Sequence, residues 1–339
     1  MSNAKVKPSF DANRQVLGTV LPLSAPFTLI IDSGDICNFR CSYCFRGNPA
    51  GFDCGPFNKN SRMGWETFLC VADQITGFPQ PPKTISLSCH GEPLCNPLLP
   101  KMVAHIKKLG TSAKTSIHTN ASLLDKKTAQ ALVDAGLDRM VVSLQGMCAE
   151  DYRKTCGVSL DYERLLERLR YFYTIKTNTE VCIKIVDVAL SRPEQEFYDV
   201  FSQVADRVFV EKVVPIWEEV HIEDEAVNKY GEKYKVIDCC PLLFHTLVVT
   251  CPGDILPCTR LNPPFTMGSI FETTLTDSWS GHKRNEFLKK MLALGRAACG
   301  VCSGCYIPQN SVYGHEDIID DYRDEILERL TVNGITLDK

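Results

Sequence analysis

Three cysteines stand at the spacing C-x3-C-x2-C in residues 35–46, directly after an apolar run at residues 27–31. The thiols of Cys37, Cys41 and Cys44 can turn toward one another on a single tight loop, because eight residues contain all three. Thiolates are ligands of iron–sulfur clusters and of zinc. A structural zinc ion normally has four protein ligands, so three thiols leave one coordination position for chemistry. The pattern alone also permits a zinc knuckle or three unrelated core thiols.

The composition limits the class of protein. A chain of 339 residues with 44% hydrophobic residues is long enough for one large domain and a small second one. The formal net charge is −4 without a basic run, so we expect no nucleic-acid partner. A polar N-terminus and the lack of a long apolar stretch predict a cytoplasmic protein without a membrane span. In such a compartment, the 17 cysteines indicate metal binding rather than disulfides.

Strand and helix patterns alternate along the first two thirds of the chain. The predicted strands cover residues 27–31, 84–89, 115–118, 139–144, 180–186 and 207–214. This alternation predicts a parallel sheet with helices outside it, and right-handed crossovers curl such a sheet toward a barrel. Six units rather than eight would leave the barrel open on one side. We therefore predict an α/β fold, a partial (β/α)6 barrel.

The pattern changes after Pro215. An acidic segment at residues 218–224 is expected to be a linker, and turn residues at 252–254 separate two hairpin strands at residues 244–250 and 255–258. Helices are predicted at residues 283–294 and 318–330. The predicted organisation is an N-terminal extension (1–26), the barrel (27–234), a small cysteine-rich domain built from a hairpin and helices (235–310) and a helical tail (311–339).

The spacing C-x3-C-x-aromatic-C after a first strand resembles the signature of the radical S-adenosylmethionine (SAM) superfamily. The resemblance implies that Cys37, Cys41 and Cys44 bind three irons of a [4Fe–4S] cluster and that the fourth iron binds the amino and carboxyl groups of SAM. It also implies that Tyr43 lies against the adenine, and that a flavodoxin- or ferredoxin-type protein donates electrons.

Further motifs fall where the predicted strands end, which is where parallel sheets collect their ligands. Gly91-Glu92-Pro93 resembles the "GGEP" element that holds the amino group of SAM, although His90 replaces the first glycine. Thr119-Asn120 resembles the "TNG" element, with Ala121 in place of glycine. The resemblance therefore implies that Gly91, Glu92 and Asn120 bind SAM.

Two polar residues on the fourth and fifth strands are further candidates for SAM binding. Ser143 begins a segment that resembles the "SxDG" element, with Gln145 in place of aspartate. Its alternative role is to end the strand and cap the next helix. Lys184 stands among apolar residues in the middle of its strand, so it needs a counter-charge or a cavity. It either faces the barrel interior and meets a ligand carboxylate or extends outward.

A second group of thiols lies in the C-terminal third of the chain. Its members are Cys239, Cys240, Cys258, Cys299, Cys302 and Cys305. A hairpin with a C-x2-C pair is also typical of a zinc ribbon. Together with the first triplet, the group resembles the auxiliary cluster domain of radical SAM enzymes, called SPASM in its long form and twitch in its short form. Because no cysteine follows Cys305, we predict one auxiliary [4Fe–4S] cluster, bound by Cys240, Cys258, Cys299 and Cys302, with Cys305 or Cys239 as substitutes.

The predicted activity is that of a radical SAM oxidoreductase or epimerase. Such an enzyme cleaves SAM reductively to a 5′-deoxyadenosyl radical, which takes a hydrogen atom from the substrate. In an epimerase a cysteine must return a hydrogen atom from the other face, and Cys148 and Cys156 are the candidates. Only about 26 residues precede the first strand, too few for a peptide-binding module. We therefore expect a small polar, carbohydrate-like substrate.

Two alternatives stay open. The first is a peptide-modifying (RiPP) maturase that uses a separate recognition protein. The second is a non-catalytic zinc protein that binds a partner through its C-terminal domain.

Overall fold

The computed structural model describes residues 4–8, 14–47, 55–57, 60–216, 227–233, 235–312 and 314–334. The acidic segment predicted at residues 218–224 lies outside these ranges. Within them, every helix is too short or too polar to span a bilayer. The domain boundaries stay predictions.

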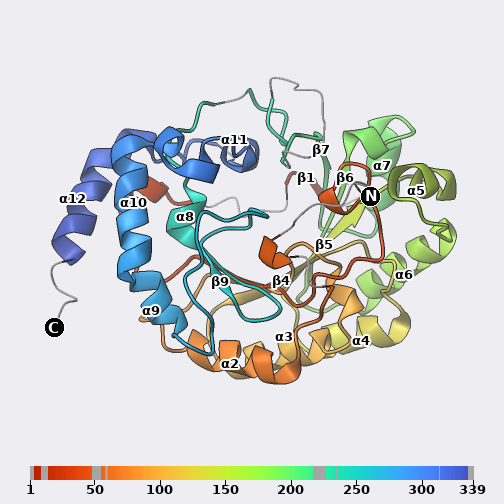
Figure 1. Ribbon diagram of the computed structural model, residues 1–339. Coiled ribbons are helices and arrows are strands. Elements are labelled where there is room, and N and C mark those ends of the chain that lie inside the picture. Colours follow the sequence, from red (N-terminus) through yellow and green to blue (C-terminus); the bar gives the residue numbers. More distant parts are fainter. Residues whose placement is uncertain are drawn as a thin grey trace.

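Six parallel strands form the centre of the molecule (Figure 1). They are β2 (Thr28–Ile31), β3 (Thr84–Ser86), β4 (Lys114–Thr119), β5 (Arg139–Leu144), β6 (Glu180–Val186) and β7 (Arg207–Glu211). Each pairs in parallel with the next in chain order. The predicted partial (β/α)6 barrel is therefore confirmed.

Three further strands extend this sheet at both edges. β1 (Lys5–Val6) pairs in parallel with β7, and β8 (Thr246–Val249) pairs in parallel with β2. β9 (Ile255–Leu256) then pairs antiparallel with β8. The predicted hairpin is confirmed, although its first strand begins later because α8 (Leu242–His245) precedes it. The sequence analysis missed that this strand joins the barrel sheet, which ties the cysteine-rich part to β2 through backbone hydrogen bonds.

Amphipathic helices cover the outside of the barrel. They are α2 (Trp65–Ile75), α3 (Leu99–Lys108), α4 (Lys126–Asp134), α5 (Ala149–Cys156), α6 (Tyr162–Ile175) and α7 (Glu194–Phe201) (Figure 1). In α2 the buried residues are Phe68, Val71, Ala72 and Ile75, a spacing of three and four that turns one face to the core. Asp125 caps the start of α4 by accepting a hydrogen bond from the backbone NH of Thr128 (2.7 Å). The hydrophobic patterns of the sequence predict helices at residues 64–76, 97–109, 124–135, 162–173 and 193–204, which are confirmed, whereas α5 was not predicted.

The C-terminal helices pack beside the hairpin. They are α9 (Leu275–Ser280), α10 (His282–Leu294), α11 (Ile307–Ser311) and α12 (Arg323–Gly334), and α1 (Leu17–Val20) from the N-terminal part joins their apolar core. Figure 1 shows α10 and α12 on the flank opposite α5 and α7. The buried thiols Cys239, Cys240, Cys258, Cys299 and Cys302 belong to this second core.

Asn96 connects the segment after β2 with the start of α3, and its replacement tests this connection. Its Nδ2 donates to the carbonyls of Ser33 (2.7 Å) and Met63 (3.0 Å), and its Oδ1 accepts from the backbone NH of Leu98 (2.9 Å). Asn96→Leu would leave these buried groups unpaired, so we expect the free energy of unfolding to fall by about 2–4 kcal/mol. Urea denaturation measures this loss.

The matched control is Asn178→Leu, since Asn178 is exposed. We expect it to change the free energy of unfolding by less than about 0.5 kcal/mol. Equal stabilities of the two variants would contradict the role of Asn96.

Candidate functional site

The loop of the three cysteines follows β2 at the carboxyl edge of the sheet. Cys37, Cys41 and Cys44 are half-buried, and the backbone NH of Cys44 donates to the carbonyl of Cys41 (3.0 Å). Burial first, and then the neighbouring Glu92, Cys41 and Cys44, raise the pKa of Cys37 to about 11. The three thiols therefore lie near enough to influence one another.

The chemistry of these donors fits an iron–sulfur cluster with three protein ligands. They are soft sulfur donors on one loop, and the binding of a positively charged metal centre favours the thiolate that burial alone disfavours. Among the described residues, no group of three or more His, Cys, Asp or Glu side chains lies close enough to hold a metal ion as the side chains stand.

Helix α5 ends against this loop. The backbone NH of Ser42 donates to the carbonyl of Thr155 (2.8 Å), and that of Arg40 donates to the carbonyl of Cys156 (3.2 Å). The buried thiol of Cys156 is hydrogen-bonded to Cys41, and this bond and burial raise the pKa of Cys41. Cys156, a predicted hydrogen donor, thus contacts a residue of the cysteine triplet. The other predicted donor, Cys148, precedes α5 as its N-cap residue.

Gly91 packs directly against the cysteine loop. A Cβ at this position would lie 2.0 Å from the carbonyl oxygen of Gly34 and 2.8 Å from that of Ile36. The next residue, Glu92, donates its backbone NH to the carbonyl of Ile36 (2.8 Å). Glycine is therefore required here because two backbone segments touch. The assignment of Gly91 to SAM binding stays a prediction.

The carboxylate of Glu92 joins the loops after β3 and β4. Its Oε1 accepts from the hydroxyl of Thr119 (2.6 Å) and the backbone NH of Leu94 (3.0 Å), and its Oε2 accepts from the backbone NH of Asn120 (2.7 Å). Glu92 is 2% exposed, and burial raises its pKa to about 7. The side chain of Asn120 donates to Oδ1 of Asn38 in the cysteine loop (2.9 Å). One hydrogen-bonded network thus connects three of the predicted motifs.

Two departures from the family motifs have structural consequences. Ala121 adopts a φ of 57°, the left-handed conformation that favours glycine, so the backbone geometry of the "TNG" element persists without its glycine. His90 makes edge contacts with the rings of Phe45 and Phe57. Its Nε2 is 2.7 Å from the carbonyl oxygen of Thr259, the neighbour of Cys258. His90 therefore links the cysteine loop to the hairpin of the C-terminal part.

Tyr43, Ser143 and Lys184 lie at different places around the barrel. The pKa of Tyr43 is raised by burial and by the thiols of Cys41 and Cys156, beside which it lies. Ser143 and Lys184 are register partners on β5 and β6, so they share one face of the sheet. Lys184 lines the barrel interior and forms an ion pair with Glu211 (2.6 Å), which decides between its two predicted orientations.

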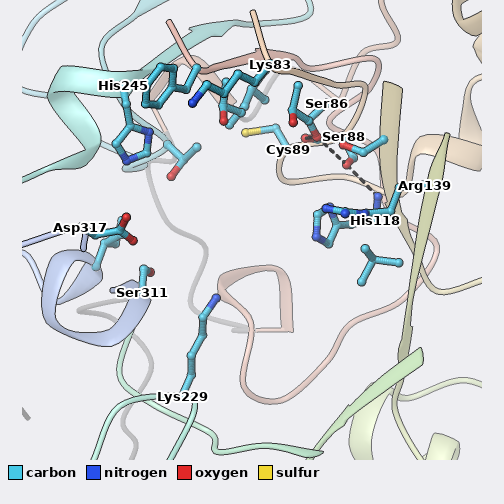
Figure 2. Close-up of a pocket in the computed structure, with 18 of the residues that line it drawn as sticks. Lys83, Ser86, Ser88, Cys89, His118, Arg139, Lys229, His245, Ser311 and Asp317 are labelled. Carbon is cyan, nitrogen blue, oxygen red and sulfur yellow. Dashed lines mark hydrogen bonds between the residues drawn. The ribbon is translucent and has the colours of Figure 1, made fainter. Parts of the chain in front are cut away.

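A cavity of about 660 Å³ occupies the inside of the barrel. Residues of β2 to β6 form one wall, and Lys229, Tyr230, Ser311 and Asp317 close the other side (Figure 2). This volume is within the range of small-molecule sites. His118 projects into the cavity, where burial and the charges of Lys184 and Lys229 lower its pKa to about 3. It is therefore neutral at physiological pH.

Several cavity residues carry no sequence motif and were missed. Cys89 is one of them, and Figure 2 shows its sulfur directed toward the cavity. The period of two along the predicted strand at residues 84–89 would have placed Ser86 and Ser88 on one face. No sequence signal identifies Lys229, which follows the acidic segment.

Four thiols of the second cysteine group lie near one another. Cys240, Cys258, Cys302 and Cys305 influence one another electrostatically, and burial raises the pKa of Cys258 and of Cys302 to about 12. Cys299 lies near Cys302 and near Cys239. Four thiols suit a cluster with four protein ligands. The predicted ligand Cys299 and its substitute Cys305 both lie near Cys302, so the ligand set stays a prediction.

Comparison with known proteins identifies the family. Residues 31–196 match the radical SAM superfamily, and residues 239–306 match the SPASM iron–sulfur cluster-binding domain. The chain therefore belongs to the radical SAM superfamily. Within that superfamily it carries a SPASM-type domain. Its cofactors are therefore SAM, a [4Fe–4S] cluster and auxiliary iron–sulfur clusters. The second match is to an iron–sulfur cluster-binding domain, which argues against the alternative of a zinc protein.

Curated relatives match parts of the chain. The dTDP-4-amino-4,6-dideoxy-D-glucose ammonia-lyase of Streptomyces venezuelae is 29% identical over 47% of this chain and 32% of its own length. The GTP 3′,8-cyclase of Staphylococcus carnosus (strain TM300) is 29% identical over 59% of this chain and 64% of its own length. The chain thus matches less than two thirds of either relative.

Solved structures share the fold. BtrN in complex with AdoMet and 2-DOIA has a TM-score of 0.55 at 18% identity, covering 86% of this chain and 96% of that chain. Streptococcus suis SuiB bound to the precursor peptide SuiA has a TM-score of 0.61 at 19% identity, covering 88% and 76%. At these identities the similarity establishes the fold alone.

Replacement of Gly91 tests the contact that holds the cysteine loop. Gly91→Ala would force the loop away from its position, because the added methyl has no space beside the carbonyl of Gly34. We expect the anaerobically reconstituted variant to lose about four iron atoms per chain. Iron and sulfide analysis measures the loss.

Gly64→Ala is the matched control, since a Cβ at Gly64 would meet no atom within 4 Å and its φ is −71°. It should keep the iron content of the wild type. A Gly91→Ala protein with full iron content would contradict the proposed packing.

Proposed function

We propose that this radical SAM enzyme abstracts a hydrogen atom from a small polar, carbohydrate-like substrate bound inside the barrel, and that the outcome is dehydrogenation or epimerisation. The observation that carries the proposal is the cavity of about 660 Å³ between the barrel and the C-terminal part, which has the volume of a small-molecule site. Lys229, Tyr230 and Ser311 place polar groups opposite the barrel strands, which suits a small polar metabolite. The names of both curated relatives also state small, phosphate-bearing substrates.

The cofactor-binding roles follow from the donor types. Cys37, Cys41 and Cys44 would hold the cluster that binds SAM, and Cys240, Cys258, Cys302 and Cys305 the auxiliary one. When bound, these groups would supply the electron that cleaves SAM to methionine and a 5′-deoxyadenosyl radical and would accept the second electron of a dehydrogenation. A flavodoxin- or ferredoxin-type protein would provide the reducing electron.

The residues of the chain position the reactants. Glu92 and Asn120 brace the cysteine loop and would present acceptors to the amino group of SAM. Tyr43 would lie against the adenine, and Ser143 would donate to the ribose or carboxylate. In an epimerisation, Cys89 would return the hydrogen atom, because of the described cysteines it is Cys89 that lines the cavity. This replaces Cys148 and Cys156, which do not line it.

Peptide modification is the second candidate. SuiB, which shares the fold, was solved with its precursor peptide. The cavity volume of about 660 Å³ is that of a small-molecule site, which favours the first candidate.

Product analysis tests the proposed function. The reconstituted protein, reduced and incubated anaerobically with SAM, should form 5′-deoxyadenosine. Cys41→Ala should abolish this product, whereas Cys70→Ala, a replacement on α2 away from the loop, should retain it. No 5′-deoxyadenosine from the wild type with any reductant would contradict the proposal.

The change in mass from substrate to product identifies the type of reaction. With nucleotide sugars and aminocyclitols as candidate substrates, loss of two hydrogen atoms would indicate dehydrogenation. One deuterium gained from heavy water would indicate epimerisation. If the enzyme converts peptides but none of these small compounds, peptide modification is favoured instead.

Iron analysis tests the auxiliary ligands. Cys305→Ala should bind about four fewer iron atoms than the wild type, because a ligand of the second cluster is lost. Cys299→Ala is the matched control from the same segment and should keep the wild-type content. The opposite pattern would restore Cys299 as the ligand.

A further inference from the structure

Most of the charged residues that line the cavity in the barrel are cations. Arg14, Lys83, Arg139, Lys184 and Lys229 contribute positive charge to its wall, and among the described lining residues Asp317 contributes the negative charge. The histidines do not add to this charge, because burial lowers the pKa of His90 to about 4 and that of His118 to about 3.

Three of the five cations have carboxylate partners. Arg14 pairs with Asp317, Arg139 with Glu180 (2.7 Å) and Lys184 with Glu211 (2.6 Å). Five cations therefore face three carboxylates, which leaves a surplus of two positive charges.

Lys83 and Lys229 supply this surplus. In the described part of the chain, neither ammonium group forms an ion pair. Nζ of Lys83 lies 3.6 Å from the ring centre of Phe27 and 3.4 Å from Oε1 of Gln15. Burial alone would lower the pKa of Lys229, but Tyr230 and Glu211 raise it, so this lysine stays charged.

The two lysines approach the cavity from opposite sides. Figure 2 shows Lys229 reaching into the centre and Lys83 at the far wall, with the hydroxyls of Ser86, Ser88 and Ser311 around the same space. Lys83 is exposed, whereas Lys229 is half-buried near Glu211, whose carboxylate already pairs with Lys184. An anion bound in the cavity would give Lys229 a counter-charge that it does not share with Lys184. Lysines act as point charges for phosphate, and hydroxyls donate to its remaining oxygens.

We propose that the substrate carries a phosphate or diphosphate ester, with Lys229 as its principal contact and Lys83 at the other side of the cavity. A surplus of two charges matches the charge of such a group. This inference names the substrate class of the proposed function and rests on it for the chemistry. The anion site itself is testable by binding alone, without turnover.

The test measures binding of inorganic pyrophosphate to the reconstituted protein by isothermal titration calorimetry. We expect saturable binding to the wild type and binding weakened about tenfold or more in Lys229→Met, because one charge-assisted contact is lost. Lys229→Arg keeps the charge and should bind within about threefold of the wild type. The matched control Lys127→Met replaces an exposed lysine on α4 and should bind like the wild type.

Lys83→Met should also weaken pyrophosphate binding. This variant tests the anion site independently if Lys229→Met does not fold. Absence of saturable binding to the wild type, or unchanged binding in Lys229→Met or in Lys83→Met, would overturn the proposal. Succinate binding as tightly as pyrophosphate would also overturn it, in favour of a dicarboxylate site. Because SAM cleavage is not measured, failure here leaves the 5′-deoxyadenosine test of the proposed function unaffected.

Competition identifies the source of the phosphate. Thymidine diphosphate and glucose 1-phosphate are each titrated against bound pyrophosphate. Displacement by the first supports a nucleotide-linked substrate, and displacement by the second supports a simple sugar phosphate. Displacement by neither overturns the assignment to a phosphate ester.

Discussion

Gly91 and Glu92 hold the cysteine loop against the ends of β3 and β4, and the rest of the site depends on this contact. The backbone of Gly91 touches the backbone of residues 34–36 so closely that no Cβ would fit between them, and this contact fixes the position of residues 34–36. The buried carboxylate of Glu92 fixes Asn120, which in turn binds Asn38 between the first two cysteines. The thiols are thus positioned by groups from the loops after three strands.

The C-terminal part completes the same site rather than forming a separate unit beside it. β8 extends the barrel sheet next to β2, and His90 joins the segment before Gly91 to the carbonyl of Thr259 beside Cys258. Ser311 and Asp317 close the cavity opposite the barrel strands.

The barrel and the cysteine triplet were predictable because apolar runs, turn residues and ligand spacing are local signals. Helix α5 was missed because its eight residues bury only two apolar side chains, Tyr152 and Cys156, which is too short a repeat to recognise among charged neighbours. No sequence signal decides between Cys299 and Cys305, since two residues separate each of them from Cys302. Lys83 and Lys229 line the same cavity only in the folded barrel, so their relation depends on tertiary structure.

The most direct measurement is electron–nuclear double resonance on the reduced protein with SAM labelled at its amino nitrogen and carboxyl oxygen. If the loop of three thiols leaves one iron without a protein ligand, both labels will show hyperfine coupling to the cluster. Absence of coupling from either label, with a cluster spectrum that SAM does not change, would contradict the account. It would mean that a fourth side chain, such as the neighbouring Cys156, completes the coordination.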